Sequence, residues 1–505
     1  MSLARKNTAL ATLLFALTTC VSTAAFAGGL EMPDHGTEAL GRGGAFTAKA
    51  DDPTAVYYNV AGLAEQRGTR LLANANASQS SLRFERAGNY AEEAGVSWSG
   101  KKYPAVDNQG GPVVLPFLAA TSDLGLSWMT VALAAYAPPV ASYSGRTYPL
   151  AVDGAPSPAR YDAVGGTSSV IMFYTGAMAF KLGDSIDIGV AVHAVQATIE
   201  TRTVSYLDLS QCKSSESQQC DGRSDGKSSG WTATGSVGAL ARLGKGVSAG
   251  LNVRGPVLMQ TVGEAMTTSP RALGGTLSSP YRVGLRNAFP LVARAGLRKA
   301  WTKDRGQTEV ADVELDVTYE RWSDAQAPGP QALLERLGGK NNVNVSVVHN
   351  YVDTFSLRLG GAYNLSSLPL TLRAGTFYDA SATQGADTRV DADTLAKVAG
   401  TLGMGLKVGS FGLNIAYAGV YDVPRTVSDG RFRPINAARG GTTNDVNGNP
   451  LPAVNNGAYS GFTHVVSLGV TVEIDKLMGF GRGAPSSPPS PAAPVQGRSG
   501  GQTTL

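Results

Sequence analysis

The stretch from Ala311 to Trp322, ADVELDVTYERW, alternates between apolar and charged residues over more than ten positions. One set of alternate positions is apolar: Val313, Leu315, Val317 and Tyr319. The other set is strongly acidic: Asp312, Glu314, Asp316, Thr318 and Glu320. Because successive side chains of a β-strand point to opposite faces, this pattern predicts a strand with one apolar and one acidic face.

The same period of two recurs along most of the chain, for example in DSIDIGVAVHAV (184–195) and THVVSLGVTVEID (463–475). The segments are about ten residues or longer, as a tilted crossing of a bilayer requires. Short turns at 183–184, 243–246, 366–367 and 409–410 alternate with long polar loops, which is typical of outer-membrane barrels. The expected strands are 69–80, 112–122, 125–137, 168–181, 184–201, 230–243, 246–262, 288–301, 308–322, 353–365, 367–380, 396–409, 410–422 and 462–475. The sequence therefore predicts an all-β protein, a transmembrane antiparallel β-barrel of about fourteen strands over residues 69–475.

The two ends of the chain lack the alternating pattern of the expected barrel. Residues 1–27 resemble a signal peptide, with Arg5 and Lys6 before an apolar core and Ala25-Phe26-Ala27 at the expected cleavage site. A lipoprotein anchored through Cys20 is the alternative, which Thr19 disfavours. Residues 476–505 are rich in Pro, Gly and Ser and predict a disordered tail. Between the strands, GPQALLERLGG (329–339) predicts a short amphipathic helix in a long loop.

Composition narrows the range of partners. The chain has 62 glycines, 16 % charged residues and a formal net charge of +4. That charge is small and no basic cluster accompanies it, so nucleic acid is not an expected partner. No apolar run after the leader reaches the roughly 18 residues of a membrane helix.

Cys212 and Cys220 are the two cysteines that remain after cleavage. They lie in a polar segment between two expected strands, and in an oxidising compartment a disulfide is the favoured interpretation. The alternative, a metal site, lacks nearby ligands to complete a tetrahedron, so no metal is expected.

Several segments, taken in order, resemble the FadL-type outer-membrane transporters of long-chain fatty acids and aromatic hydrocarbons. They are GTEALGRGGAFTAKADDPTAVYYNVAGLA (36–64), LAAYAPPVASYSG (133–145), the segment from RYDAVGG to ATIE (160–200), VELDVTYERWS (313–323) and the segment from NYVDTFS to FYDAS (350–381). The resemblance covers about residues 28–475. It implies a fourteen-stranded barrel blocked by an N-terminal hatch, with an apolar pocket beside the hatch and a side opening in the wall.

The hatch is expected over residues 28–68. Its motif residues are Gly41, Gly43, Gly44, Asp51, Asp52, Pro53, Asn59 and Ala61. The resemblance is partial, because the family commonly has Asn-Pro-Ala where this chain has Asn59-Val60-Ala61, and Val fixes the backbone less than Pro. A chain that continues about thirty residues past its last strand is a second departure. Asp51 and Asp52 before Pro53 predict an Asx-type turn rather than a metal site.

A fatty acid requires an apolar sleeve and a donor for its carboxylate, for which arginine is suited. Arg358 and Arg373 alternate with apolar neighbours and are expected to point into the lumen; Arg202 is a third candidate. The alternative for each is an ion pair with lumenal acids such as Asp312, Glu314 and Asp316. Phe46, Tyr57 and Tyr58 are expected to fill or line the pocket.

An enzyme is not expected. His464 and Ser467 lie on opposite faces of one strand by parity and cannot form a dyad within it, and the chain has no Gly-x-Ser-x-Gly motif. The expected function is hatch-gated uptake of hydrophobic molecules, long-chain fatty acids first, by a monomer in the bacterial outer membrane, surrounded by its lipid and without a cofactor. The alternatives are a general porin, which the hatch argues against, and a surface adhesin, for which no passenger region exists.

Overall fold

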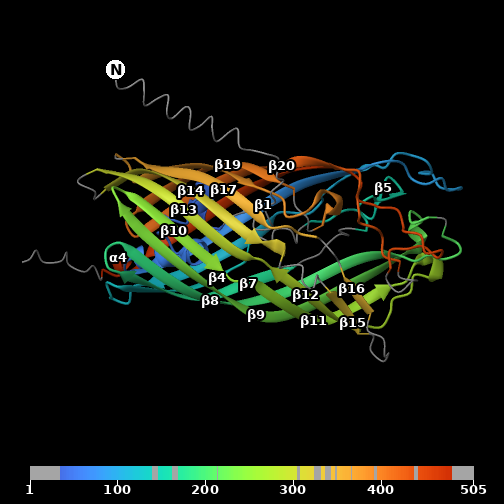
Figure 1. Ribbon diagram of the computed structural model, residues 1–505, viewed down its shortest axis with the longest axis horizontal. Coiled ribbons are helices and arrows are strands. Elements are labelled where there is room, and N and C mark those ends of the chain that lie inside the picture. Colours follow the sequence, from blue (N-terminus) through green and yellow to red (C-terminus); the bar gives the residue numbers. More distant parts are fainter. Residues whose placement is uncertain are drawn as a thin grey trace, which may run out of the picture.

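In the computed structural model the wall of the molecule is a single closed, antiparallel β-barrel (Figure 1). The structure describes residues 35–138, 146–161, 169–212, 214–303, 308–323, 331–335, 343–346, 350–365, 367–391, 395–436 and 442–479. The strands of the wall are β1 (Thr69–Arg86), β3 (Val113–Ser122), β4 (Met129–Tyr136), β7 (Val170–Leu182), β8 (Ile186–Tyr206), β9 (Asp221–Gly244), β10 (Val247–Arg254) with β11 (Val257–Thr268), β12 (Tyr281–Phe289) with β13 (Leu291–Lys303), β14 (Thr308–Arg321), β17 (Thr354–Asn364), β18 (Leu370–Asp379), β19 (Lys397–Val408), β20 (Phe411–Val427) and β21 (Gly457–Glu473).

Each wall strand pairs with its neighbours in sequence, and β1 pairs with β21 to close the ring. The closing ladder runs from Arg70 opposite Glu473 to Arg86 opposite Gly457. Two crossings are broken in the middle: β10 and β11 form one, and β12 and β13 form the next. If each broken crossing is counted once, the wall has fourteen crossings, which is the number that the alternation predicted.

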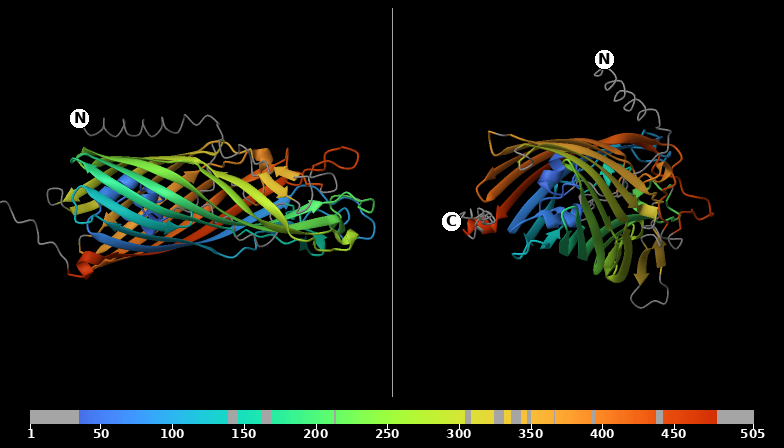
Figure 2. Two further views of the ribbon diagram at one scale, coloured as in Figure 1. Left: turned by 90° about the horizontal axis from the view of Figure 1, so that it is seen from below. Right: turned by 60° about the vertical axis from the view of Figure 1, so that its left-hand side comes forward.

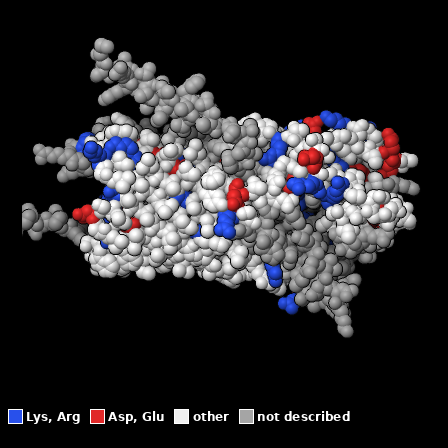
Figure 3. Space-filling model, viewed as in Figure 1, with Lys and Arg blue, Asp and Glu red and all other residues white. Residues whose placement is uncertain are grey.

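The wall has the inverted polarity of a membrane barrel. On β14 the apolar residues Val313, Leu315 and Val317 are 45 %, 44 % and 40 % exposed, whereas the carboxylates of Asp312 and Glu314 are buried in the lumen. The face shown in Figure 3 accordingly has a broad uncharged region over the body of the barrel. The acidic face predicted from ADVELDVTYERW is thus the inner one.

The two ends of the barrel differ in loop length. Short connections, including 183–185, 245–246 and 409–410, lie at the end that carries helix α4 (Ile474–Leu477). Long connections lie at the other end, and there the structure adds β2 (Ala105–Asp107), β5 (Ala151–Val152), β6 (Ala155–Pro156) and the 3₁₀ turns η3 (Gln218–Cys220), η4 (Arg271–Leu273) and η7 (Gly385–Asp387). By the usual asymmetry of such barrels, the long loops mark the extracellular mouth.

The segment before β1 lies inside the barrel, where Figure 2 shows it in blue within the ring of strands. It contains α2 (Thr37–Gly41), α3 (Ala55–Tyr58) and the 3₁₀ helix η1 (Val60–Glu65). From His35 to Gln66, all residues are buried except five that are partly buried. These five are Glu38, Lys49, Asp51, Asp52 and Glu65. This is the expected hatch.

Two expectations about the elements are wrong. The helix expected over 329–339 is a strand where the structure describes it: β15 (Gln331–Glu335) pairs with β12 and with β16 (Val343–Ser346). There the pairing to the free edge of β12 outweighs the local helix preference. The single strands expected over 246–262 and 288–301 are each interrupted, at Gly255-Pro256 and at Pro290, because proline has no N–H to donate to a ladder.

The predicted signal peptide and the tail from residue 480 onwards lie outside the described residues. No helix in the described part of the chain is long and apolar enough to cross a membrane.

Candidate functional site: the hatch, the lumen and the mouth

The hatch is attached to the inner acidic row of β14. Arg42 donates to Asp312 and to Glu314, at 2.8 and 3.3 Å. The backbone N–H of Ala48 donates to Glu314 at 2.6 Å, and those of Phe46 and Thr47 donate to Asp316 at 2.9 and 2.8 Å. Three inward carboxylates spaced by two residues therefore bind one cation and a run of backbone N–H groups.

Asn59, the residue before the unusual Val60, connects the hatch to a second part of the wall. Its amide nitrogen donates to the carbonyls of Thr47 and Ala239, at 2.9 and 3.0 Å, and its side-chain oxygen accepts from the backbone N–H of Ala61. The amide thus holds the hatch together and ties it to β9 without a proline at position 60.

Close backbone contact explains why glycines occur on the inner wall. A Cβ added at Gly360 would lie 1.8 Å from the carbonyl oxygen of Arg42, and one added at Gly375 would lie 2.2 Å from the carbonyl carbon of the same residue. Larger residues at these two positions on β17 and β18 would displace the hatch. Within the hatch, the N–H of Thr54 donates to the carboxylate of Asp52 at 2.8 Å, which forms the expected Asx turn before Pro53.

Aromatic rings of the hatch and wall form an apolar cluster inside the barrel. Tyr57 contacts Tyr58 and the ring of His35, each with centroids 5.0 Å apart, and Phe46 contacts Tyr58 at 5.5 Å. The wall contributes a stacked series, Phe117 on β3, Tyr136 on β4 and Phe173 on β7. The cluster also includes Val195, Val257 and Met259. All are buried, and together they form the apolar contact between the hatch and this side of the wall.

Two arginines border this cluster. Arg294 on β13 lies over the ring of Tyr57 at 4.5 Å and donates to the carbonyl of Tyr57 at 3.3 Å. Arg254 on the adjacent β10 lies over Phe173 at 5.7 Å. Both are about 95 % buried or more. Sequence reasoning did not select them, although their alternation with Val253 and Ala293 carried the same signal as the arginines that it did select.

The arginines selected from the sequence lie in three different surroundings. Arg358 points inward as expected and contacts Asp379 at 3.1 Å and the carbonyl of Gly43 at 3.4 Å. Arg373 also points inward and contacts Glu38 of the hatch at 2.8 Å and Asn414 at 2.9 Å. Both are thus engaged with the hatch, and a head-group role for them stays a prediction.

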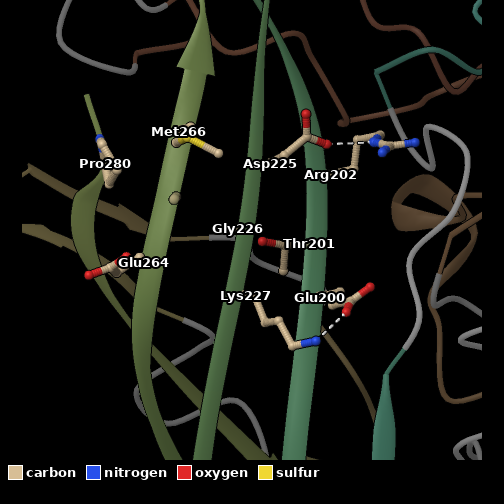
Figure 4. A pocket seen from close by; sticks show the side chains of 10 residues that line it. Glu200, Thr201, Arg202, Asp225, Gly226, Lys227, Glu264, Met266 and Pro280 are labelled. Atoms are coloured by element: carbon tan, nitrogen blue, oxygen red, sulfur yellow. Dashed lines mark hydrogen bonds and ion pairs between the residues drawn. The ribbon is translucent and has the colours of Figure 1, made fainter. Parts of the chain in front are cut away.

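Arg202 lies far from the hatch, towards the extracellular end of β8. It contacts Asp225 on β9 at 2.6 Å and borders a shallow groove of about 280 Å³ between β8, β9 and β11 (Figure 4). Lys227 and Glu200 pair across the same groove. Its role as a head-group donor is likewise untested.

The extracellular loops meet over the mouth. Arg146, in the β4–β7 connection, donates to the carbonyls of Val390 and Asp391 in the β18–β19 connection. The N–H of Tyr206, at the end of β8, donates to Ile435 in the β20–β21 connection. A disulfide joins Cys212 to Cys220 within the β8–β9 connection. Contacts between loops from different parts of the ring therefore reach across the mouth.

Among the described residues, no group of three or more histidines, cysteines and carboxylates could hold a metal ion. His464 is exposed and Ser467 is buried, in agreement with the parity argument that separates them. The buried His193 instead contacts Thr175 and Ser236, each at 2.7 Å, on the lumenal face of β7, β8 and β9.

A fourteen-stranded wall with an apolar outer face and a hatch in its lumen defines a plugged outer-membrane channel. A sequence model of the family described as outer membrane protein transport protein (OMPP1/FadL/TodX) matches residues 18–404. The chain therefore belongs to the FadL/TodX family, outer-membrane transport channels for hydrophobic compounds rather than enzymes.

Solved structures share the fold. A FadL homologue of Pseudomonas aeruginosa has a TM-score of 0.68 and 17 % identity, covering 88 % of this chain and 100 % of its own. The toluene transporter TbuX of Ralstonia pickettii has a TM-score of 0.59 and 14 % identity, covering 87 % and 98 %. The toluene transporter TodX of Pseudomonas putida has a TM-score of 0.57 and 14 % identity, covering 89 % and 100 %. A search of curated protein sequences found no match.

Proposed function

We propose that this channel takes up long-chain fatty acids by passive, hatch-gated diffusion, with release through the side of the wall. The observation that carries the proposal is the pairing of a buried aromatic cluster with two buried arginines, Arg254 and Arg294, at its edge. An apolar tail needs the cluster, and a carboxylate needs charged donors in a low-dielectric site. A hydrocarbon without a charged group would not interact with the two arginines in this way.

Side release is favoured by a weak place in the wall. Register places Pro256 directly opposite Pro290, since Arg254 pairs with Val292 and Val257 pairs with Phe289. Neither proline has an N–H, so the ladder loses bonds from both strands at this level.

The neighbouring seam is irregular at the same level. The β9 ladder to β10 ends with Ser236 opposite Arg254, and its ladder to β11 begins only with Ser229 opposite Val262. Val257 and Met259 of the aromatic cluster lie on the lumen side of this break, whereas Leu258 and Trp231 are 64 % and 60 % exposed. The apolar interior and the outer apolar surface thus approach each other here.

Uptake of radiolabelled oleate and of radiolabelled toluene, in a strain lacking its own transporters, tests the substrate. We expect oleate uptake to depend on the channel, and alanine at Arg254 or Arg294 to reduce it more than alanine at Arg202. Channel-dependent uptake of toluene alone would overturn the fatty-acid proposal and favour an aromatic hydrocarbon, for which the ring-lined cluster is also suited. Alanine at Arg202, Arg358 and Arg373 in the same assay tests the three donors selected from the sequence.

A liposome-swelling assay with small sugars tests the hatch-gated mechanism. Slow swelling is expected, because the buried hatch occupies the lumen. Rapid swelling would favour a general porin.

A further inference from the structure

One carboxylate at the extracellular mouth lies between two buried arginines. Glu216 belongs to the loop that the Cys212–Cys220 disulfide closes. Its two oxygens accept from Arg86 at 2.9 Å and from Arg160 at 3.2 Å, and the first also accepts from the hydroxyl of Tyr103 at 3.2 Å. Glu216 is 4 % exposed, and Arg86 and Arg160 are 4 % and 0 % exposed.

The three charged residues come from different parts of the barrel. Arg86 ends β1, Arg160 follows β6 in the β4–β7 connection, and Glu216 lies in the β8–β9 connection. The carboxylate therefore joins two connections and a wall strand that are separate in sequence. The contact is made by side chains only, so breaking it would not unpair any wall strand.

Each arginine is held in place by contacts other than Glu216. Arg160 donates to Asp221 at 2.9 Å and lies over the ring of Tyr161 at 4.3 Å. Arg86 lies over the ring of Tyr103 at 4.2 Å. The pair of guanidinium groups is consequently organised for a carboxylate, whichever molecule supplies it.

Apolar rings adjoin the arginine pair. Tyr90 contacts Tyr103 at 4.4 Å and Trp98 at 5.1 Å, and this cluster includes Ala155. On the other side, Cys220 packs with Tyr161, Tyr206 and Leu451. An anionic head bound to the arginines would thus have apolar surface beside it for the first part of a tail.

Glu216 is charged at neutral pH. Burial alone would raise the pKa of its carboxyl, but Arg160 and Arg86 outweigh burial and hold that pKa below its usual value. Burial raises the pKa of Tyr103 to about 12, so its hydroxyl stays a donor. The occupant of the arginine pair is therefore a carboxylate anion of the same kind as a fatty-acid head group.

We propose that Arg86 and Arg160 form a capture site for the carboxylate of an amphiphile at the mouth, with Glu216 as a built-in occupant that the incoming carboxylate replaces. The inference rests on the proposed fatty-acid function and adds a second, outer binding site. Glu216 keeps the arginines paired when no substrate is present, and a molecule without an anionic head does not compete with it for them.

The substitution E216Q separates this role from a merely structural one, since the amide keeps the size of the side chain and one acceptor oxygen but loses its charge. Binding of radiolabelled decanoate and of 1-decanol is measured on the purified full-length protein. E216Q is expected to bind decanoate about tenfold more tightly, because a site occupied by Glu216 for most of the time is available only for the remaining fraction. Decanol binding is expected to be unchanged.

Two further variants complete the test. E93Q changes another carboxylate of the extracellular loops, which contacts Ser217 instead of the arginines, and should leave both ligands unaffected. R86Q combined with E216Q should abolish the gain. Bromodecanoate bound at this site should quench the fluorescence of Trp98. Loss of that quenching in W98F would locate the ligand beside the ring cluster.

An unchanged decanoate affinity in E216Q, or an equal gain for decanol, overturns the capture site if the disulfide and the thermal unfolding of the variant match the wild type. Oleate uptake by the wild type distinguishes the two proposals. Uptake without an E216Q effect leaves the fatty-acid function standing, whereas no uptake by the wild type removes the proposed function itself.

Discussion

Arg42 shows how much of this fold depends on single buried charges. It is fully buried and contacts two carboxylates of β14, and its backbone lies against the glycines of β17 and β18. Breaking a buried ion pair by removing one partner costs about 3–5 kcal/mol in proteins, because the other charge stays buried. Glu314 would keep the N–H of Ala48 as a donor, and Asp312 would keep Arg298.

The substitution R42A is therefore expected to loosen the hatch without preventing the barrel from forming. Liposomes that contain R42A should swell clearly faster in small sugars than liposomes that contain the wild type. The barrel of R42A should still resist unfolding by detergent at room temperature. R83A is the matched control, since Arg83 and Asp107 form an exposed pair of the kind that contributes about 0–1 kcal/mol. A channel as tight as the wild type after R42A would show that the backbone contacts suffice to hold the hatch.

At the scale of single residues, the alternation along each strand predicted correctly which side chains face the lumen. It could not predict which residues those side chains contact. It put Arg358 and Arg373 in the lumen, where they are. It also put the acidic row of β14 there, but the partner of that row, Arg42, comes from a segment without period, whose path no local pattern encodes. Arg254 and Arg294 were visible in the alternation, yet it is their place beside Phe173 and Tyr57 of the large aromatic cluster that distinguishes them from Arg358.

Among the elements, the hatch is separable from the wall in its hydrogen bonding. Every wall crossing is paired to its two neighbours, and the ring closes through β1 and β21. The hatch meets this wall through side chains and backbone contacts instead of a shared ladder. Its helices are short, so the wall supplies most of what orders them.

Deletion of residues 28–60 is expected to give a barrel that still assembles but leaks. Small sugars should enter liposomes rapidly, because the space from His35 to Val60 is then vacant, whereas heat-dependent mobility in gel electrophoresis should still show a folded barrel. An intact permeability barrier after this deletion would refute the hatch assignment. Failure of the barrel to assemble would instead show that the hatch is needed for folding.

The elements that sequence reasoning missed share a cause. Gly255-Pro256 and Pro290 were readable as strand breaks, but the alternation on either side was strong enough to suggest continuous strands. The alternation shifts by one residue at the break. Arg254 and Val257 are both buried, although residues three positions apart on a continuous strand would face opposite sides. The strand at 331–335 was missed for the opposite reason, since its pairing partner on β12 is distant in sequence and local helix preference decided the prediction.

At the scale of the whole molecule, the wall is a closed ring of paired strands. Release through its side therefore requires two neighbouring strands to separate, and the question is which pair does so. The seam between β9 and β11 can be fixed near the proline break with two cysteines, since the hydroxyls of Ser228 and Thr261 are 2.8 Å apart. The double variant S228C/T261C should lose most oleate uptake when oxidised and regain it on reduction. The matched control is T69C/S122C on the β1–β3 seam, where the hydroxyls are 3.1 Å apart.

The control cross-link should leave uptake unchanged, and the wild type with and without reductant accounts for the native disulfide. Equal uptake by the fully oxidised S228C/T261C variant would place the exit elsewhere in the wall. Loss of uptake in both cross-linked variants would indicate that the barrel must flex as a whole, without a preferred seam.

Thr37, in the first helix of the hatch, contacts both strands that close the ring: its hydroxyl lies 2.8 Å from that of Ser467 on β21 and accepts from the side chain of Asn74 on β1. These two strands are the first and last of the wall to be synthesised, and they meet only when the cylinder is complete. One hydroxyl of the hatch thus bridges the joint at which biogenesis ends. A correctly seated hatch would favour the right register of that final joint, so the channel would be sealed in the same step that completes its wall.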